Sequence, residues 1–319
     1  MVKVAVAGGT GNVATELLRE PIASGKHDIT ILTRKDPPTG NPIGGVSYKK
    51  VDYSSVESLT EELRGYDVCL SFLIIMDEAG FQAQKNLIDA CVAAGVKKFA
   101  PTEWGIKTNS GIRAYAPKDR TAAYLSSLNT PTPKLNYCLF HPSIWMDYFA
   151  HPYPLSPNLI TWPFFIDPHT RHAILFDDEA HNTAPLVVTA ISDVSYILAL
   201  ALDDASPWPS EGGIRGARTS IAELFALAQR IRGGEWHVER VKLADLEAGN
   251  LTTRWIPEFT HPAIPEALRE GFSREFVVEF MKAVVRGAWD VGDEWNRRFP
   301  GYRFKGLEEY LVEAWRGRE

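Results

Sequence analysis

The sequence of 319 residues has few cysteines, no long uncharged apolar run and no excess of positive charge, and each absence excludes a class of protein. The three cysteines, Cys69, Cys91 and Cys138, lack the close spacing of a zinc site or a redox pair, so we interpret them as small core residues in a reducing compartment. No apolar run is long enough to cross a membrane, and the chain opens on an apolar strand pattern instead of an export signal. We therefore expect a cytoplasmic protein without a membrane partner.

The charge and the histidines exclude two further kinds of ligand. A formal net charge of -6 leaves no broad positive field for a polyanion, so nucleic acid is not expected as a partner. His169 and His172, with His151 and His181 nearby, lie in a stretch that prolines interrupt, which prevents a helical face of metal ligands. We expect no metal site there.

Runs rich in Val, Ile and Phe alternate with helical periodicity through the first half of the chain. The expected strands cover 2–7, 28–33, 46–51, 67–73, 97–101 and 135–140, and the expected helices cover 13–24, 56–63, 81–94 and 119–128. Gly95 follows the third helix as a left-handed terminating residue. This alternation predicts an α/β fold of the Rossmann type, with a doubly wound parallel sheet.

The amino-acid composition changes after residue 150, where a segment rich in proline and aromatic residues begins. We expect a dinucleotide-binding domain over 1–150 and a smaller, partly interleaved α+β substrate domain over 151–319. Apolar periodicity returns at 186–202, which is expected to pack back on the first domain. Further helices are expected at 221–231, 274–285 and 307–315, with a strand at 237–241.

A glycine turn joins the first strand to the first helix. Gly8 and Gly11 lack a Cβ atom where the chain turns sharply, and they let a pyrophosphate approach the backbone at the start of a helix. Ala14 occupies the third position of the motif, where a methyl group is tolerated. We expect Gly8, Thr10, Gly11, Asn12 and Val13 to bind a dinucleotide, and a simple turn without a ligand is the alternative.

The type of dinucleotide is indicated by the end of the second strand. An NAD site places a carboxylate there, whereas an adenosine 2′-phosphate requires cationic donors. This chain has Arg34, which can fork two N–H groups onto the phosphate, followed by Lys35. We therefore expect NADP(H) as the cofactor. The alternative is that both cations are merely solvated at the strand end.

Several segments resemble the NmrA-like and isoflavone reductase-like branch of the atypical short-chain dehydrogenases. They are GGTGNVA, the strand-end TRK, QKNLIDACVAAGVKKFAPTEWG and APKDRTAAYL, with FPGYRFKGLEEYLVEAW near the C-terminus. The resemblance covers nearly the whole chain and is densest over residues 1–128. It implies an NADPH-binding domain, a smaller substrate domain and an active site in the cleft between them.

The resemblance also implies a catalytic lysine shortly after the segment PTEWG, and Lys118 matches that place. We expect Lys118 to be the catalytic residue and a cofactor contact, as general acid or electrostatic stabiliser, because hydride transfer builds negative charge on oxygen. An exposed lysine in the first turn of a helix is the alternative. Tyr115 is one residue too close for the Tyr-x-x-x-Lys pair and is not assigned as an acid. Phe72 and Gln84 complete the expected cofactor contacts.

The expected substrate contacts are Trp104, His141, Trp145 and Tyr148. They belong to a set of aromatic residues suited to a planar or polycyclic ligand, although most of that set is expected in the core. Trp104 stands where the family has phenylalanine, and Ser143 where it has glycine, so the resemblance does not specify a substrate. A bulky His141-Pro142 is expected to narrow the pocket, with His141 either a second acid–base group or a wall residue.

Together these features predict an enzyme that reduces a carbonyl or a conjugated double bond of an aromatic secondary metabolite with NADPH, as a monomer or homodimer. Two alternatives stay open. One is a redox-sensing regulator that binds the dinucleotide without turnover, which the resemblance associates with absence of the lysine. The other is a non-redox rearrangement or cyclisation on the same fold, because a fold does not fix chemistry.

Overall fold

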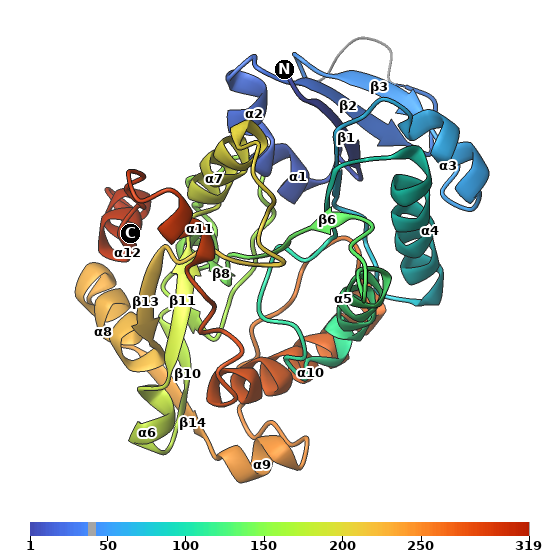
Figure 1. The fold of residues 1–319 in the computed structure, drawn as a ribbon. Helices are drawn as coiled ribbons and strands as arrows, with labels where there is room; N and C mark the ends of the chain where they lie inside the picture. The colour runs from blue at the N-terminus through green and yellow to red at the C-terminus, as the bar shows by residue number, and fades with distance from the viewer. Residues whose placement is uncertain (38–42, 319) are drawn as a thin grey trace.

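A six-stranded parallel sheet forms the N-terminal half of the molecule in the computed structural model, which describes residues 1–37 and 43–318 (Figure 1). Its strand order is β3-β2-β1-β4-β5-β6, the Rossmann order, and it confirms the predicted fold class. The strands are β1 (Lys3–Ala7), β2 (Asp28–Thr33), β3 (Ser47–Lys50), β4 (Val68–Ser71), β5 (Lys98–Ala100) and β6 (Asn136–Tyr137).

Helices cover both faces of this sheet. The helices of one face are α3 (Val56–Leu63), α4 (Glu78–Ala94) and α5 (Ala116–Leu128), and those of the other are α1 (Asn12–Leu17), α2 (Arg19–Ala23) and α7 (Ile191–Asp203). Alternate residues of β1 serve the two sides, because Val4 and Val6 pack towards α1 and α7, whereas Ala5 and Ala7 pack towards α3 and α4. Within the segment 186–202, which was expected to return to the first domain, α7 packs on this face, whereas residues 186–189 belong to a strand of another sheet.

The first helix is split in two, which corrects the single helix expected over 13–24. Pro21 has no N–H group to donate to the carbonyl of Leu17, so the helical ladder breaks there. The hydroxyl of Ser195 on α7 satisfies both freed groups, since it donates to the Leu17 carbonyl (3.0 Å) and accepts from the Glu20 N–H (3.0 Å). The break therefore fixes α7 against the dinucleotide-binding half.

The expected sixth strand is also divided. Residues 136–137 continue the large sheet, whereas β7 (Leu139–His141) turns away to pair with β12 (Glu211–Gly213). The strand β8 (Ile144–Trp145) pairs with β11 (Pro185–Thr189), which in turn pairs with β13 (Ala217–Ser220). A third small sheet contains β9 (Ile166–Asp167), β10 (His172–Phe176) and β14 (His237–Val241). Segments on both sides of residue 150 thus pair with each other, and the domain boundary at 150 stays a prediction.

The remaining helices surround these small sheets. They are α6 (Glu179–Asn182), α8 (Ile221–Arg232), α9 (Leu243–Glu247), α10 (Glu266–Val285), α11 (Glu294–Arg298) and α12 (Leu307–Trp315), with 3₁₀ turns at Arg113–Tyr115 and Met146–Ala150. The helix α10 starts two turns before the expected residue 274. Gly95 ends α4 with a φ of 76°, as predicted, and the three cysteines are buried and unpaired. Among the described residues, no helix is both long and apolar enough to cross a membrane.

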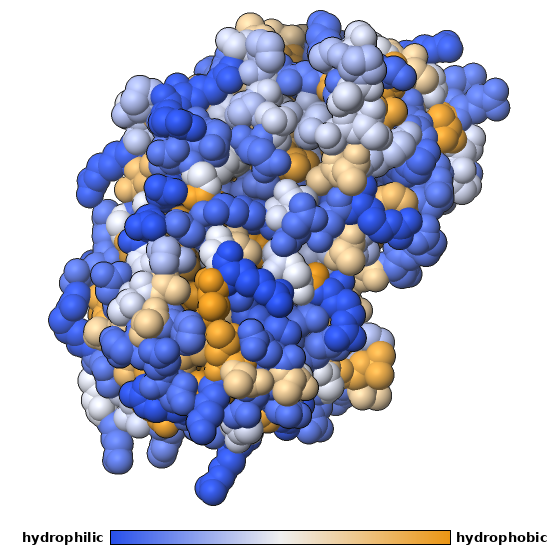
Figure 2. All heavy atoms as spheres, turned by 60° about the horizontal axis from the view of Figure 1, so that its bottom comes forward, coloured by the Kyte–Doolittle hydropathy of each residue, from blue (hydrophilic) through white to orange (hydrophobic). Residues whose placement is uncertain are grey.

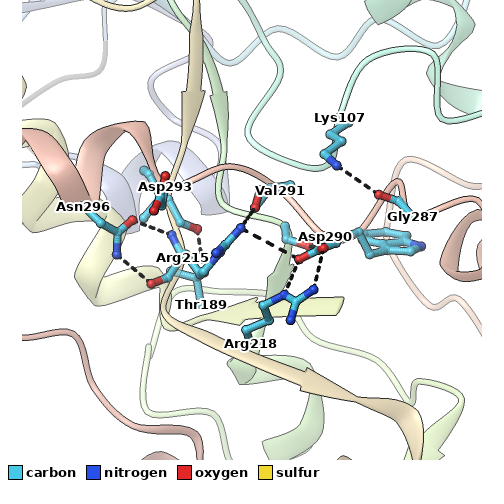
Figure 3. Close-up of polar contacts among 12 residues, drawn as sticks. Lys107, Thr189, Arg215, Arg218, Gly287, Asp290, Val291, Asp293 and Asn296 are labelled. Carbon is cyan, nitrogen blue, oxygen red and sulfur yellow. Dashed lines mark hydrogen bonds and ion pairs between the residues drawn. The ribbon is translucent and has the colours of Figure 1, made fainter. Parts of the chain in front are cut away.

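A polar network fixes the chain that follows α10 (Figure 3). Asp290 accepts two hydrogen bonds from Arg218 on β13 (2.8 and 3.0 Å). Asn296 exchanges hydrogen bonds with the backbone of Arg215 (2.9 and 2.8 Å), and Lys107 donates to the Gly287 carbonyl (3.2 Å). Because Lys107 follows the PTEWG segment, the network connects that segment to the end of α10.

The outer surface is largely hydrophilic on the face shown in Figure 2, where apolar residues form separate patches. The described large apolar side chains with the greatest exposure outside the N-terminal methionine are Ile74 and Leu268. Ile74 lies in the loop after β4 and also lines the cleft described next, and Leu268 lies in the first turn of α10.

Candidate active site

A cavity of about 360 Å³ lies at the carboxyl ends of the central strands. Three loops form its floor, namely Gly11–Ala14 after β1, Phe72–Met76 after β4 and Thr102–Gly105 after β5. The strand order reverses direction between β1 and β4, and open α/β sheets bind their ligands at this point. The cavity volume suits a small molecule.

The glycine turn packs directly on the end of β4. Gly8 has a φ of +72°, and a Cβ atom on it would lie 2.7 Å from the carbonyl carbon and oxygen of Phe72. Gly11 donates its N–H to the Gly8 carbonyl (3.1 Å) and precedes α1 without contributing a side-chain cap. The first-turn N–H groups of α1 are therefore left at the cavity for an anion, as a pyrophosphate requires.

The structure brings some of the expected cofactor contacts together and separates others. Gly11, Asn12, Val13, Phe72 and Lys118 line the cavity, while Gly8 and Thr10 belong to the turn beneath it. Gln84 is fully buried and accepts hydrogen bonds from the Ser71 hydroxyl (2.8 Å) and the Thr102 N–H (3.4 Å). Gln84 therefore ties the loops after β4 and β5 together instead of reaching the cavity.

Arg34 and Lys35 lie at the carboxyl end of β2, outside the cavity and exposed to solvent. The nearby Asp36 is paired with Lys50 (2.6 Å). Within residues 1–37 and 43–318, no hydrogen bond or ion pair occupies the Arg34 guanidinium or the Lys35 ammonium. Two uncommitted cations thus lie where the adenosine end of a dinucleotide would reach.

Lys118 enters the cavity from the first turn of α5, where Pro117 fits because a helix start needs no N–H donor at that position. Its Nζ donates to the backbone carbonyl of Glu103 (2.7 Å) and lies 4.6 Å from the centre of the Tyr115 ring. Burial lowers the pKa of Lys118, and the nearby Glu103 and Asp119 oppose that shift. A lysine with a lowered pKa can release a proton more readily than an exposed one.

Glu103 is the second ionisable group of the cavity, and it was not among the residues expected from the sequence. It is only 4% exposed, and burial raises the pKa of its carboxyl to about 7, opposed by Lys118. Tyr115 also lines the cavity, and burial raises the pKa of its phenol to about 12. The tyrosine thus stays protonated at neutral pH.

Trp104 forms the apolar floor beside Lys118. Its backbone has a φ of 45°, a strained conformation for a bulky residue, and its indole N–H donates to the Ser71 carbonyl (2.8 Å). The ring stacks between Phe72 (centroids 4.7 Å apart) and Phe140 (4.9 Å). These contacts hold the strained residue in place, so Trp104 presents a fixed flat surface. Trp145 and Tyr148, the other expected substrate contacts of this kind, also line the cavity.

His141 lies behind the cavity and not in its lining, which corrects the expectation that it contacts substrate or narrows the pocket. It is 2% exposed, and its Nδ1 lies 3.3 Å from Glu211 on β12. Ser143 does line the cavity, and its φ of 64° explains why a glycine would suit this position. Its hydroxyl donates to the Trp289 carbonyl (2.9 Å), which supports the left-handed conformation.

The wall opposite Lys118 was largely missed from the sequence. It is formed by Phe272, Phe276 and Phe280, spaced by four residues along α10, with Phe259 and His261 from the preceding loop. The spacing of the phenylalanines was a readable signal of a common helix face. No periodicity marks the loop, in which His261 Nε2 lies 3.4 Å from the side-chain nitrogen of Asn12 across the cavity.

Comparisons with known proteins agree with this geometry. Residues 2–247 match the model of the NmrA-like family. The oxidoreductase swnN of Metarhizium robertsii is 27% identical to this chain, and the alignment covers 99% of this chain and 98% of that protein. The oxidoreductase BOA1 of Botryotinia fuckeliana is also 27% identical, and the alignment covers 74% of this chain and 78% of that protein. The NADPH complex of leucoanthocyanidin reductase from Vitis vinifera superposes with a TM-score of 0.68 at 17% identity, covering 98% of this chain and 99% of that one.

Proposed function

The chain belongs to the NmrA-like family, and from this premise we propose that it is an NADPH-dependent reductase of a carbonyl or conjugated double bond in an aromatic secondary metabolite. The observation that carries the proposal is the position of Lys118, a half-buried residue whose ammonium group enters the cavity at the carboxyl ends of the central strands. Relatives named oxidoreductases and a structural neighbour solved with NADPH support it.

The residues present fit a dinucleotide phosphate cofactor. The glycine turn leaves space that a Cβ atom would fill and exposes helix N–H groups to a pyrophosphate, and Arg34 with Lys35 offers two exposed cations for a 2′-phosphate. When bound, NADPH supplies the hydride. The protein's part is to hold the substrate's acceptor carbon against the nicotinamide and to stabilise the charge that develops on the substrate.

Lys118 is the group that meets this charge. A reduced carbonyl or enone carries negative charge on oxygen, and an ammonium group aimed at that oxygen stabilises it and then donates a proton. The Glu103 carbonyl orients Nζ, and the Tyr115 ring lies beside it, so the ammonium is positioned before the substrate arrives. A regulator that only binds the dinucleotide has no need of a buried lysine in this place.

The lining of the cavity supports an aromatic substrate. Trp104, Trp145, Phe276 and Phe280 offer flat apolar surfaces. The ionisable side chains in the same lining are Lys118, Glu103, Tyr115 and His261. Such a site favours a neutral planar molecule with one polar acceptor group, because an additional charge would be buried without a partner. A structural neighbour has been solved with NADP+ and the small molecule (+)-pinoresinol together.

The proposal is tested by incubating the protein with NADPH and a panel of enones, aryl ketones and quinones while the reduced nicotinamide is followed by absorbance. Oxidation that depends on both the protein and one class of compound is expected. Clear dinucleotide binding without oxidation of NADPH by any compound would contradict the reductase and favour the regulator. Conversion of a compound while NADPH stays intact would favour a non-redox reaction.

Replacement of Arg34 with alanine is expected to weaken NADPH binding about 10- to 100-fold, the value of one or two lost charge-assisted hydrogen bonds. NADH binding should change little, since NADH lacks the 2′-phosphate. Titration of cofactor fluorescence measures both affinities, and Arg64→Ala, an exposed arginine after α3, is the control. Tighter binding of NADH than NADPH by the unaltered protein would overturn the role given to Arg34.

A further inference from the structure

Three ionisable side chains, Glu103, His141 and Glu211, form a group that begins at the floor of the cavity and continues behind it. Glu103 and His141 are 4% and 2% exposed, and in each of them a buried side-chain atom, Oε1 of Glu103 and Nε2 of His141, has no hydrogen-bond partner within the described part of the chain. The side chain of Glu211 is 60% exposed. The three residues thus extend from the cavity to the protein surface.

Backbone contacts on both sides of Glu103 and His141 keep their two segments close together. Phe99 of β5 pairs with Tyr137 of β6, and the two chains are again adjacent where the Ser143 N–H donates to the Gly105 carbonyl (2.8 Å). Glu103 and His141 lie between these two contacts, where the two chains part, and Glu211 is near both of their side chains. On the far side of His141, β7 pairs with β12, and Nδ1 of the ring lies 3.3 Å from Glu211 Oε2.

The three residues have different charged neighbours. Glu103 faces Lys118 and Asp119 of α5 and feels Glu211 of β12, while His141 faces Lys107, Lys118 and Glu211. Burial lowers the pKa of His141 to about 3, so its ring is neutral at pH 7 and can donate a proton from one nitrogen while it accepts at the other.

Burial raises the pKa of Glu211, and Glu294 of α11 adds to this shift. Burial likewise raises the pKa of Glu103 to about 7. Each carboxyl can therefore hold a proton closer to neutrality than an ordinary glutamate.

We propose that Glu103, His141 and Glu211 return a proton from the protein surface to Lys118 after each reduction. The inference rests on the proposed function, in which Lys118 gives one proton to the substrate and becomes a neutral amine. Substrate and dinucleotide would then cover the amine from the cavity side. The other route by which a proton can reach the Lys118 amine runs through the wall of the cavity behind it.

The proton transfers balance without an oxidant or a reductant. The Glu103 carboxyl gives its proton to the Lys118 amine, through one water molecule or after rotation of its side chain, because Nζ contacts only the Glu103 backbone carbonyl in the structure. His141 then passes its Nε2 proton to the Glu103 carboxylate through one water molecule or after a side-chain rotation, because neither Nε2 nor Glu103 Oε1 has a hydrogen-bond partner among the described residues, while Nδ1 takes a proton from the Glu211 carboxyl. A half-turn of the imidazole ring then returns the N–H to the side of Glu103 for the next cycle. Glu211 recovers its proton from solvent.

The coupling along this route is testable without turnover or cofactor. Infrared titration of the free protein, with Glu103→Gln as the subtracted reference, should show a carboxyl that titrates at about pH 7. Glu211→Gln removes a negative neighbour and should lower that midpoint, and Lys118→Met removes a positive neighbour and should raise it. An ordinary midpoint near ~4.3, or one that Glu211→Gln does not move, would overturn the proposal.

The second test measures turnover kinetics, with the compound that the panel of enones, aryl ketones and quinones identifies as a substrate. His141→Asn and Glu103→Gln should lower kcat about tenfold or more and enlarge the solvent deuterium isotope effect, with KM little changed. The matched control is His27→Asn, because the His27 side chain is 2% exposed and 3.4 Å from Asp203 but precedes β2 at the far end of the sheet.

A purely structural role of His141 would lower thermal stability as in the His27 variant without changing the isotope effect. Equal kcat and isotope effects in the two histidine variants would overturn the relay. If no compound is reduced, the reductase proposal fails, and the infrared midpoints still decide whether Glu103 is coupled to Glu211 and to Lys118.

Discussion

Lys118→Met is expected to lower kcat for reduction at least about 100-fold, which is the usual contribution of a positioned acid. Methionine fills much of the same space, so the cavity keeps its shape while the N–H donor to the Glu103 carbonyl is lost. NADPH affinity should fall by much less, because the glycine turn and Arg34 are untouched. Stopped-flow and steady-state absorbance of the reduced nicotinamide measure the effect.

Two further variants make this result specific. Lys85→Met removes a half-buried lysine that pairs with Asp89 on α4, outside the cavity, and should retain full activity. Lys118→Arg keeps the positive charge but does not release its proton near neutral pH. Partial activity in the arginine variant would indicate electrostatic stabilisation, and its loss would indicate proton donation. Undiminished NADPH oxidation by Lys118→Met would remove Lys118 from the reaction.

Gly8→Ala is expected to abolish tight cofactor binding and to destabilise the fold. The left-handed backbone costs an alanine about 1–2 kcal/mol, and its Cβ would lie 2.7 Å from two backbone atoms of Phe72, which adds about 1–3 kcal/mol of overpacking. The turn must move to relieve this clash, so the N–H groups of α1 leave the pyrophosphate position.

Gly25→Ala is the matched control for Gly8. Gly25 has a φ of +61°, but a Cβ atom there meets nothing within 4 Å. The control therefore carries only the conformational cost, whereas Gly8→Ala carries the clash as well. Thermal melting and fluorescence titration with NADPH should separate the two variants. Equal melting temperatures together with retained NADPH affinity would show that the turn does not need a glycine at residue 8.

The sequence was sufficient for the centre of the sheet because β1, β2 and β4 are almost entirely buried and form apolar runs that local patterns reveal. The strand Asp28–Thr33 and the helix Val56–Leu63 were predicted to the residue. The helix over 13–24 was predicted as one element although Pro21 in its interior was a readable signal of a break, and the tertiary contact with Ser195 shows how the freed groups are satisfied. The division of the sixth strand likewise depends on pairing with residues 211–213, far along the chain.

The candidate site was predicted where a motif has a fixed local geometry. The glycine turn and Lys118 are such cases, and both lie at the cavity. Glu103 was not assigned a role, because its burial depends on strands and loops that the sequence does not place. His141 was expected at the wall of the cavity because it ends the sixth strand, but β7 pairs with β12 and the His141 ring lies beside Glu211 instead. His261 reaches Asn12 from a loop without periodicity, so no local signal marked it.

Transfer of hydrogen from the cofactor to the product tests the central claim most directly. NADPH carrying deuterium at C4 of the nicotinamide, in the 4R or the 4S position, is incubated with the protein and the active compound of the panel, and the product is analysed by mass spectrometry. The account predicts one deuterium in the product from one of the two labelled cofactors, and loss of that product in Lys118→Met. Product formed without deuterium from either cofactor would contradict a reductase.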